Sequence, residues 1–219
     1  MAEKARSQED KRHLLPLLLD LSGRSVVIFG GGRVGERKAR LFCGHARVVV
    51  VSKSFSAGLL QMAEKGLAEL ICADLSADFQ EYLKDAFIAI PATSDRVLNA
   101  ALEEAAVSRG VLVNKVDEAG QVVVPSILRR DPLTIAISTE SPALSKYLRL
   151  KLQEELTGNY QEMARLLAQM RKELKETVPG QARRSKIIWS ILQDPEVWRL
   201  LDLSYEKAYM RAREHVIPG

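Results

Sequence analysis

Three glycines in the first third of the chain have a spacing suited to phosphate binding. Gly30, Gly32 and Gly35 fit the pattern G-x-G-x-x-G, which closes an apolar run over residues 25–30 (SVVIFG) and opens an amphipathic stretch. In a strand–turn–helix context the first glycine permits a tight turn, the second lets the backbone approach a pyrophosphate, and the third allows close helix packing. The helix N-terminus adds free N–H groups and a positive dipole end. The spacing therefore predicts a dinucleotide site.

The second candidate contact lies at the end of the next apolar run. A dinucleotide site that prefers NAD often has an acidic residue there, which binds the ribose hydroxyls. This chain instead has Ser52, Lys53 and Ser54 after Val51. Lys53 and the serines suit a 2′-phosphate, which favours NADP, but they suit a plain ribose equally. We expect NAD as the cofactor, and the sequence leaves NADP open.

Short β-branched runs alternate with helical stretches over the first half of the chain, and this alternation must position the glycines. The expected strands are Ser25–Gly30, Ala46–Ser52, Leu67–Cys72, Ala86–Pro91 and Val111–Asn114; the expected helices are Arg33–Cys43, Phe55–Lys65 and Asp95–Arg109. Strand and helix alternating at this spacing are typical of an α/β fold with a doubly wound parallel sheet, the Rossmann arrangement.

The pattern changes after residue 120. Gln121–Pro125 and Leu133–Ser138 are predicted as two strands joined by a turn over Arg129–Pro132. Such a pair would attach to the sheet or be exchanged between subunits. From Ser141, a predicted N-cap followed by Pro142 in the first turn, the sequence is helical, with a break at residues 179–180 (PG).

Composition narrows the function classes. The net charge of +4 lies in residues 143–219, which carry 14 Lys+Arg against 10 Asp+Glu, so the C-terminal third predicts either a polyanion-binding face or solvated helices. The apolar runs are too short to cross a membrane. Cys43 and Cys72 are predicted to be free thiols in the cytoplasm, and the scattered histidines predict no metal site.

Several ordered motifs together resemble the precorrin-2 dehydrogenase family, which includes the N-terminal module of siroheme synthase. They cover residues 14–156 in register. The motifs are residues 15–24 (LPLLLDLSGR), the glycine turn with residues 36–41 (ERKARL), 92–95 (ATSD) with 98–99 (LN), 113–117 (VNKVD), 124–127 (VPSI), 131–139 (DPLTIAIST) and 141–145 (SPALS).

The resemblance implies a reaction and its residues. Precorrin-2, a reduced tetrapyrrole with eight carboxylates, loses two hydrogens and gives sirohydrochlorin, and NAD accepts the hydride; some relatives also insert ferrous iron. Asp117, close to Asn114, matches the family's essential acid and would take the departing proton. The implied cofactor contacts are Gly30, Gly32, Arg33, Val34, Gly35, Lys53, Ser54 and Thr93.

The resemblance also implies substrate contacts and a homodimer. Ser138 and Thr139 match the family's active-site serine stretch, although the usual Gly-Gly pair before Ser141-Pro142 is missing here. Arginine and lysine would bind the substrate carboxylates. The candidate cations are Arg129, Arg130, Lys146 and Arg149, and Asn114 is a further candidate substrate contact. The expected organisation is a tail over 1–12, a Rossmann domain over 13–118, an α+β dimerisation segment over 119–156 and a helical domain over 157–219.

Two other functions remain as alternatives. The first is a redox-sensing regulator that binds NAD(H) without catalysis, for which a basic helix-turn-helix is expected; the sequence contains no recognisable one. The second is an unrelated nicotinamide reductase, but no Tyr-x-x-x-Lys pair follows the fifth strand. We therefore expect an enzyme that has neither nucleic acid nor a membrane as a partner.

Overall fold

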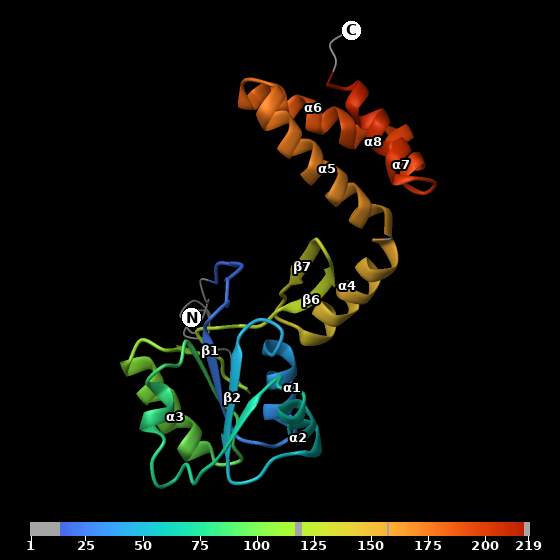
Figure 1. Cartoon of the computed structure of the whole chain (residues 1–219). Helices are drawn as coiled ribbons and strands as arrows, with labels where there is room; N and C mark the ends of the chain where they lie inside the picture. Colours follow the sequence, from blue (N-terminus) through green and yellow to red (C-terminus); the bar gives the residue numbers. More distant parts are fainter. Residues whose placement is uncertain (1–13, 117–119, 157, 217–219) are drawn as a thin grey trace, which may run out of the picture. The chain divides into compact units, whose positions relative to one another are not determined.

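The computed structural model describes residues 14–116, 120–156 and 158–216, and the chain divides into two compact units between Val124 and Pro125 (Figure 1). The predicted tail over 1–12 and the candidate acid Asp117 lie outside the described residues. Within them, no helix has both the length and the apolar character needed to cross a bilayer.

The first unit contains a parallel sheet with the strand order β3-β2-β1-β4-β5 in its described part. Its strands are β1 Ser25–Phe29, β2 Arg47–Ser52, β3 Glu69–Cys72, β4 Ile88–Pro91 and β5 Leu112–Val113. Its helices are α1 Arg33–Phe42, α2 Ala57–Glu64, the 3-10 turn η1 Gln80–Leu83 and α3 Arg96–Ser108. Each predicted strand and helix of this unit is confirmed within a few residues, and so is the Rossmann class.

Alternating side chains of the central strands pack on opposite faces of the sheet. Val26 and Ile28 of β1 belong to a buried cluster with α1 and α2, whereas Val27 and Phe29 belong to a cluster with α3. Figure 1 shows these helices on the two sides of the sheet. Burial on both faces explains the continuous apolar runs in the sequence.

The second unit begins with an antiparallel hairpin of β6 Ser126–Arg130 and β7 Leu133–Ile137, in which Arg130 pairs with Leu133 across a cis Asp131–Pro132 turn. The predicted strand Gln121–Pro125 is therefore wrong. Its residues instead run beside β5, where the Val122 N–H donates to the Val113 carbonyl and the Gln121 side chain accepts from the Val113 N–H. These bonds to β5 compete with hairpin pairing.

Helices make up the rest of the second unit: α4 Pro142–Glu155, α5 Gly158–Thr177, α6 Gln181–Gln193, α7 Pro195–Leu201 and α8 Tyr205–Glu214. The predicted cap of α4 is confirmed, because the Ser141 side chain accepts from the Leu144 N–H and Pro142 occupies the first turn. Gly180, with φ of 84°, separates α5 from α6 as predicted.

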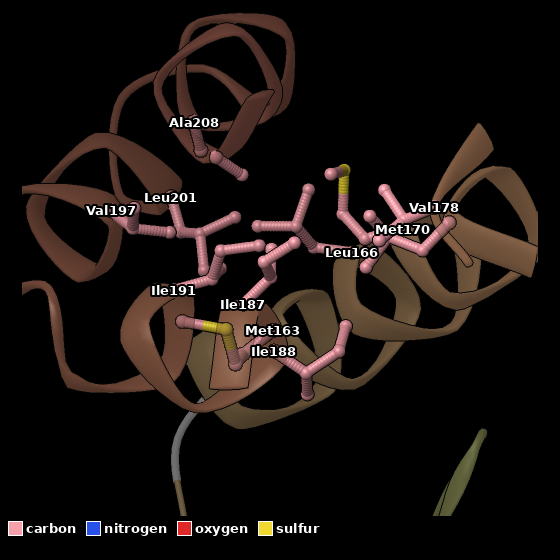
Figure 2. Close-up of a cluster of buried hydrophobic side chains, with 12 residues drawn as sticks. Met163, Leu166, Met170, Val178, Ile187, Ile188, Ile191, Val197, Leu201 and Ala208 are labelled. Atoms are coloured by element: carbon pink, nitrogen blue, oxygen red, sulfur yellow. The ribbon is translucent and has the colours of Figure 1, made fainter. Parts of the chain in front are cut away.

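A core rich in methionine and isoleucine packs the four helices α5, α6, α7 and α8 together (Figure 2). Met163, Leu166, Met170 and Leu174 repeat every three or four residues along α5 and are almost fully buried. Ile187 and Ile191 of α6 pack against them. This spacing places the apolar side chains on one helix face, so the polar side chains of α5 face outward.

Candidate functional site

A cleft of about 920 Å³ opens at the carboxyl ends of β1, β2, β3 and β4. The strand order reverses direction here, because the chain passes from β1 outward to β2 and β3 and then returns to β4 on the other side. Such a switch point is where open parallel sheets bind ligands. The described residues that line the cleft come from four places: the glycine turn (30–34), the end of β2 (52–56), the segment after β3 (73–76), and the segment from β4 into α3 (92–95 and 98).

The glycine turn has the geometry that the sequence predicted. Gly30 has φ of 121°, and a Cβ there would collide with the Ala92 carbonyl; a Cβ at Gly35 would collide with the Gly30 carbonyl. Gly32 has no heavy atom within 4 Å of an added Cβ, so its side of the turn is open. It is also the N-cap of α1 and provides no side-chain cap. The first N–H groups of α1 are therefore available to phosphate oxygens.

The turn also requires a glycine at position 31, which the sequence pattern did not predict. A Cβ at this position would overlap the Ser54 carbonyl, and its own carbonyl accepts from the Ser56 N–H at 2.8 Å. Gly31 thus holds the β1 turn against the segment that follows β2. The signal was present in the sequence, since Gly31 is the middle one of three consecutive glycines, but the G-x-G-x-x-G pattern treats it as a free position.

A carboxylate lies near the end of β2 in the structure, although the residues that directly follow β2 in the sequence include no acid. Asp74 follows β3, lines the cleft, and forms an ion pair with Lys53, with 2.9 Å between Nζ and Oδ2. Hydrogen bonds from the Ser76 side chain, then the Lys53 side chain and the Ser76 N–H lower the Asp74 pKa to about 2. Asp74 is therefore ionised at neutral pH, and its charge compensates that of Lys53.

Thr93 lies at the opposite wall of the cleft and is held by Asn99. Its hydroxyl donates to Asn99 Oδ1 at 2.7 Å, and its N–H donates to the same oxygen at 3.1 Å. Asp95 caps α3 by accepting from the Val97 and Leu98 N–H groups. The polar residues of this wall are therefore fixed by the start of α3.

Asn114, at the end of β5, is almost fully buried, with 3% of its surface exposed. Its side chain donates to the Val122 carbonyl at 2.7 Å and accepts from Lys38 Nζ of α1 at 2.6 Å. Burial, and secondarily the neighbouring charge of Arg37, lower the pKa of Lys38. The Lys38 contact was not predicted, because the two residues are 76 positions apart in the chain.

Known proteins match this chain over both units. A family model described as NAD(P)-binding matches residues 17–126. A precorrin-2 dehydrogenase of Methanosarcina barkeri is 43% identical over 206 residues, covering 91% of this chain and 92% of that protein. The chain belongs to the precorrin-2 dehydrogenase and siroheme synthase N-terminal family. The predicted family and the predicted dehydrogenase class are thereby confirmed.

Longer relatives and a solved structure agree with this assignment. Siroheme synthases of Pseudomonas aeruginosa strain LESB58 and Salmonella schwarzengrund are 35% and 33% identical; they cover 94% and 92% of this chain, which spans 44% and 45% of their length. The solved structure of "SirC, precorrin-2 dehydrogenase" has a TM-score of 0.73 at 24% identity and covers 92% of this chain and 100% of that one. At this identity the structural match supports the fold.

The cofactor contacts implied by the family resemblance gather at one place. Seven of the eight line the cleft, and Gly35 packs directly beneath the turn. The substrate candidates Ser138, Thr139, Arg129, Arg130, Lys146 and Arg149 all lie in the second unit, and Asn114 lies in the first. The structure therefore brings the cofactor set together, whereas the roles of the substrate set stay predictions.

Arg130 and Thr139 are among the substrate candidates that have structural partners. The Arg130 guanidinium donates to the Leu156 and Gln153 carbonyls at 2.6 and 3.0 Å, which caps the end of α4. Thr139 bonds to the buried Ser145 hydroxyl at 2.8 Å, and its own hydroxyl donates to the Ser141 carbonyl at 2.6 Å. These bonds close the loop that lacks the family's Gly-Gly pair. In the described part of the chain, no three His, Cys, Asp or Glu side chains gather as metal ligands.

Proposed function

We propose that this chain oxidises precorrin-2 to sirohydrochlorin with NAD as the hydride acceptor. The observation that carries the proposal is the open glycine turn at the sheet's switch point, in a chain 43% identical to a precorrin-2 dehydrogenase over nearly its whole length. The nicotinamide ring, when bound, accepts one hydride. The substrate also loses one proton, so two hydrogens leave the macrocycle in total.

The residues of the cleft bind and orient the cofactor. The open side of Gly32 and the free N–H groups of α1 fit a pyrophosphate, while Gly30 and Gly35 let the turn approach both the neighbouring strand and α1. We propose Asp117 as the base that takes the proton, because it matches the family's essential acid. This residue lies outside the described part of the chain, so its role rests on the resemblance.

We propose NAD rather than NADP because of Asp74. Its ionised carboxylate lines the cleft beside Lys53, where it can accept bonds from ribose hydroxyls and would repel a 2′-phosphate. Asp74→Asn is expected to raise the kcat/KM ratio of NADP to NAD by about tenfold, since it removes the repelling charge. Asp78→Asn, an exposed change that is not in the cleft lining, is the control and should leave the ratio unchanged. A wild-type preference for NADP would refute this assignment.

Anaerobic turnover tests the main proposal. Purified protein is mixed with enzymatically generated precorrin-2 and NAD, and the sirohydrochlorin spectrum is followed. Asp117→Ala should lower kcat by roughly 100-fold or more while NAD still binds, and Glu118→Ala, its neighbour, should not. Absence of product with either cofactor, in protein that binds NAD, would favour the redox-sensor alternative. Adding ferrous ion and comparing metal insertion with the rate without enzyme tests the second activity of some relatives.

We also propose a homodimer formed through the α+β segment over 119–156, of which residues 125–156 fall in the second unit. A two-stranded sheet alone is marginally stable and exposes its edges. Leu144, Tyr147 and Leu150 of α4 are 47%, 55% and 43% exposed, which adds an apolar strip beside the hairpin. A second copy would cover both features.

Sedimentation tests the dimer. The wild type should sediment at twice the 24.4 kDa chain mass, and Leu144→Asp with Leu150→Asp should shift it to the monomer. Leu60→Asp, at an equally exposed leucine of α2, is the control. A 24.4 kDa wild-type species at micromolar concentration would contradict the proposal.

Cys43 and Cys72 are free thiols, which supports the proposed cytoplasmic location.

A further inference from the structure

A second groove lies entirely within the helical unit, between the C-terminal half of α5 and α6. Its volume is about 530 Å³, within the range of small-molecule sites. The floor is apolar, formed by Leu174 and Ile188, which are 1% and 9% exposed. Leu174 lies on the α5 face that contributes to the core, and Ile188 lies in the second half of α6. These two side chains are almost covered, so the apolar surface that the groove offers to a ligand is mainly that of Trp189.

The rim of this groove is cationic. Among the described residues that line it are Arg171, Lys175 and Arg184, and no acidic residue is among them. Arg171 and Lys175 are four positions apart on α5 and so project from the same face. Arg184 donates to the Val178 carbonyl at 3.0 Å, which fixes its guanidinium at the groove. Fixed arginines bind carboxylates well because two N–H groups can meet two oxygens.

One wall of the groove is an exposed tryptophan. Trp189 is 60% exposed, although a large aromatic side chain is usually covered. By contrast, Trp198 is partly buried in the same unit, and its indole N–H donates to the Leu192 carbonyl at 2.8 Å. An exposed indole beside an apolar floor provides a surface for stacking a flat conjugated ring.

Neighbouring surfaces of the same unit lack this charge arrangement. The groove between α7 and α8 contains Glu196, Glu206 and Glu214 together with two cations. One of these cations, Arg211, is paired with Glu214 at 2.6 Å. The cations of the α5–α6 groove have no carboxylate within ion-pair distance in the described part of the chain. The α5–α6 groove thus carries positive charge that no carboxylate among its described lining residues offsets, which favours an anionic ligand.

We infer that the α5–α6 groove binds one edge of a carboxylated tetrapyrrole, with a ring stacked on Trp189 and carboxylates on Arg171, Lys175 and Arg184. The choice of this ligand rests on the proposed function, because both its substrate and its product are polycarboxylate macrocycles. The groove is thus a binding site for tetrapyrroles in the helical unit, and binding there does not require NAD. Such a site would keep the tetrapyrrole bound to the protein before or after its oxidation.

The test uses uroporphyrin III, a stable octacarboxylate macrocycle, with the full-length protein and NAD. Binding is followed by the shift of the porphyrin absorption band on titration with protein. Trp189→Ala should raise the Kd by about tenfold or more, because the stacking surface is lost. Arg171→Ala with Lys175→Ala should raise the Kd by about tenfold or more, because two charged contacts are lost. Lys172→Ala with Arg183→Ala is the matched control: it removes one lysine and one arginine from exposed positions of the same helices outside the groove lining, and should change the Kd less than about twofold.

Other outcomes overturn the inference. Equal weakening in both double variants would mean a general charge effect, and an unchanged Kd in Trp189→Ala would place the porphyrin elsewhere. Displacement of the porphyrin by a short DNA duplex at lower concentration would identify a nucleic-acid site. Precorrin-2 turnover is measured in parallel. Turnover without groove binding refutes this inference alone, whereas groove binding without turnover refutes the proposed function alone.

Discussion

The two units of this chain use their polar groups in opposite ways. In the first unit, the cleft at the switch point of the sheet is built largely from backbone: glycines that admit close approach and helix N–H groups that no side chain caps. In the second unit, polar side chains mostly stabilise the fold, as when Arg130 caps α4 and Asp194 joins α7 to α8. A cleft change should therefore affect binding without unfolding, and a change to such a side chain in the helical unit should do the reverse.

The largest effect is expected from Gly32→Asp. The position is open and has φ of −84°, and aspartate is a favourable N-cap, so the fold should keep its Tm. The added carboxylate occupies the space for pyrophosphate and repels it, so the Kd for NAD should rise by roughly 100-fold, about 2.7 kcal/mol. Calorimetric titration measures the Kd. Gly44→Asp, at an equally open glycine away from the cleft, is the control. An equal loss of NAD affinity in both variants would show that the position in the cleft does not matter.

Asp194→Ala is expected to show the opposite behaviour. The Asp194 side chain, 8% exposed, accepts from the Glu196 N–H as the cap of α7 and bonds to Arg211 and His215 at 2.8 and 2.9 Å. Loss of the cap and of the bonds to Arg211 and His215 should lower the free energy of unfolding by about 2 kcal/mol. Urea unfolding measures this, and NAD affinity should not change. Glu196→Ala, which removes only an exposed partner of Arg199, should leave unfolding unchanged.

The Asp194 carboxylate should also make the free energy of unfolding depend on pH, with a smaller effect than the substitution to alanine. Burial raises the pKa of Asp194, but bonds from His215, the Glu196 N–H and Arg211 outweigh burial and leave the pKa below its usual 3.8. The carboxylate's contribution is therefore complete above pH 3.8 and is lost as pH falls through the lower folded-state pKa. The difference in unfolding free energy between wild type and Asp194→Asn should shrink between pH 5 and pH 2. A constant difference would mean that ionisation of Asp194 does not stabilise the unit.

The smallest effect is expected from Lys38→Met, which removes the hydrogen bond from α1 to Asn114, the residue that follows β5. Removing Lys38 leaves the Asn114 carbonyl oxygen without this donor but also ends the burial of a charge. The two effects oppose each other, so the free energy of unfolding should change by about 1 kcal/mol or less. Arg37→Met, an exposed neighbour on α1, is the control. A loss above about 3 kcal/mol would show that Lys38 is a main support of the fold.

Sequence reasoning succeeded where the deciding forces are local. The alternation of β-branched runs with helical stretches predicted the parallel sheet, because burial on both faces requires continuous apolar strands. The glycine turn and the Ser141 cap were likewise predicted from neighbouring residues. The strand expected over Gln121–Pro125 failed for the converse reason: strand formation depends on an available partner, and bonds to Val113 keep these residues beside β5.

The sequence by itself therefore determined the Rossmann class, the geometry of the glycine turn and the family. Only the tertiary structure decided which distant side chains meet. Lys53 and Asp74 come together because β2 and β3 are parallel neighbours whose carboxyl ends share one edge of the sheet. Lys38 reaches Asn114 because α1 packs over the sheet, and Trp189 lies beside Lys175 because α6 packs against α5. Such contacts depend on chain packing, which no local pattern of residues encodes.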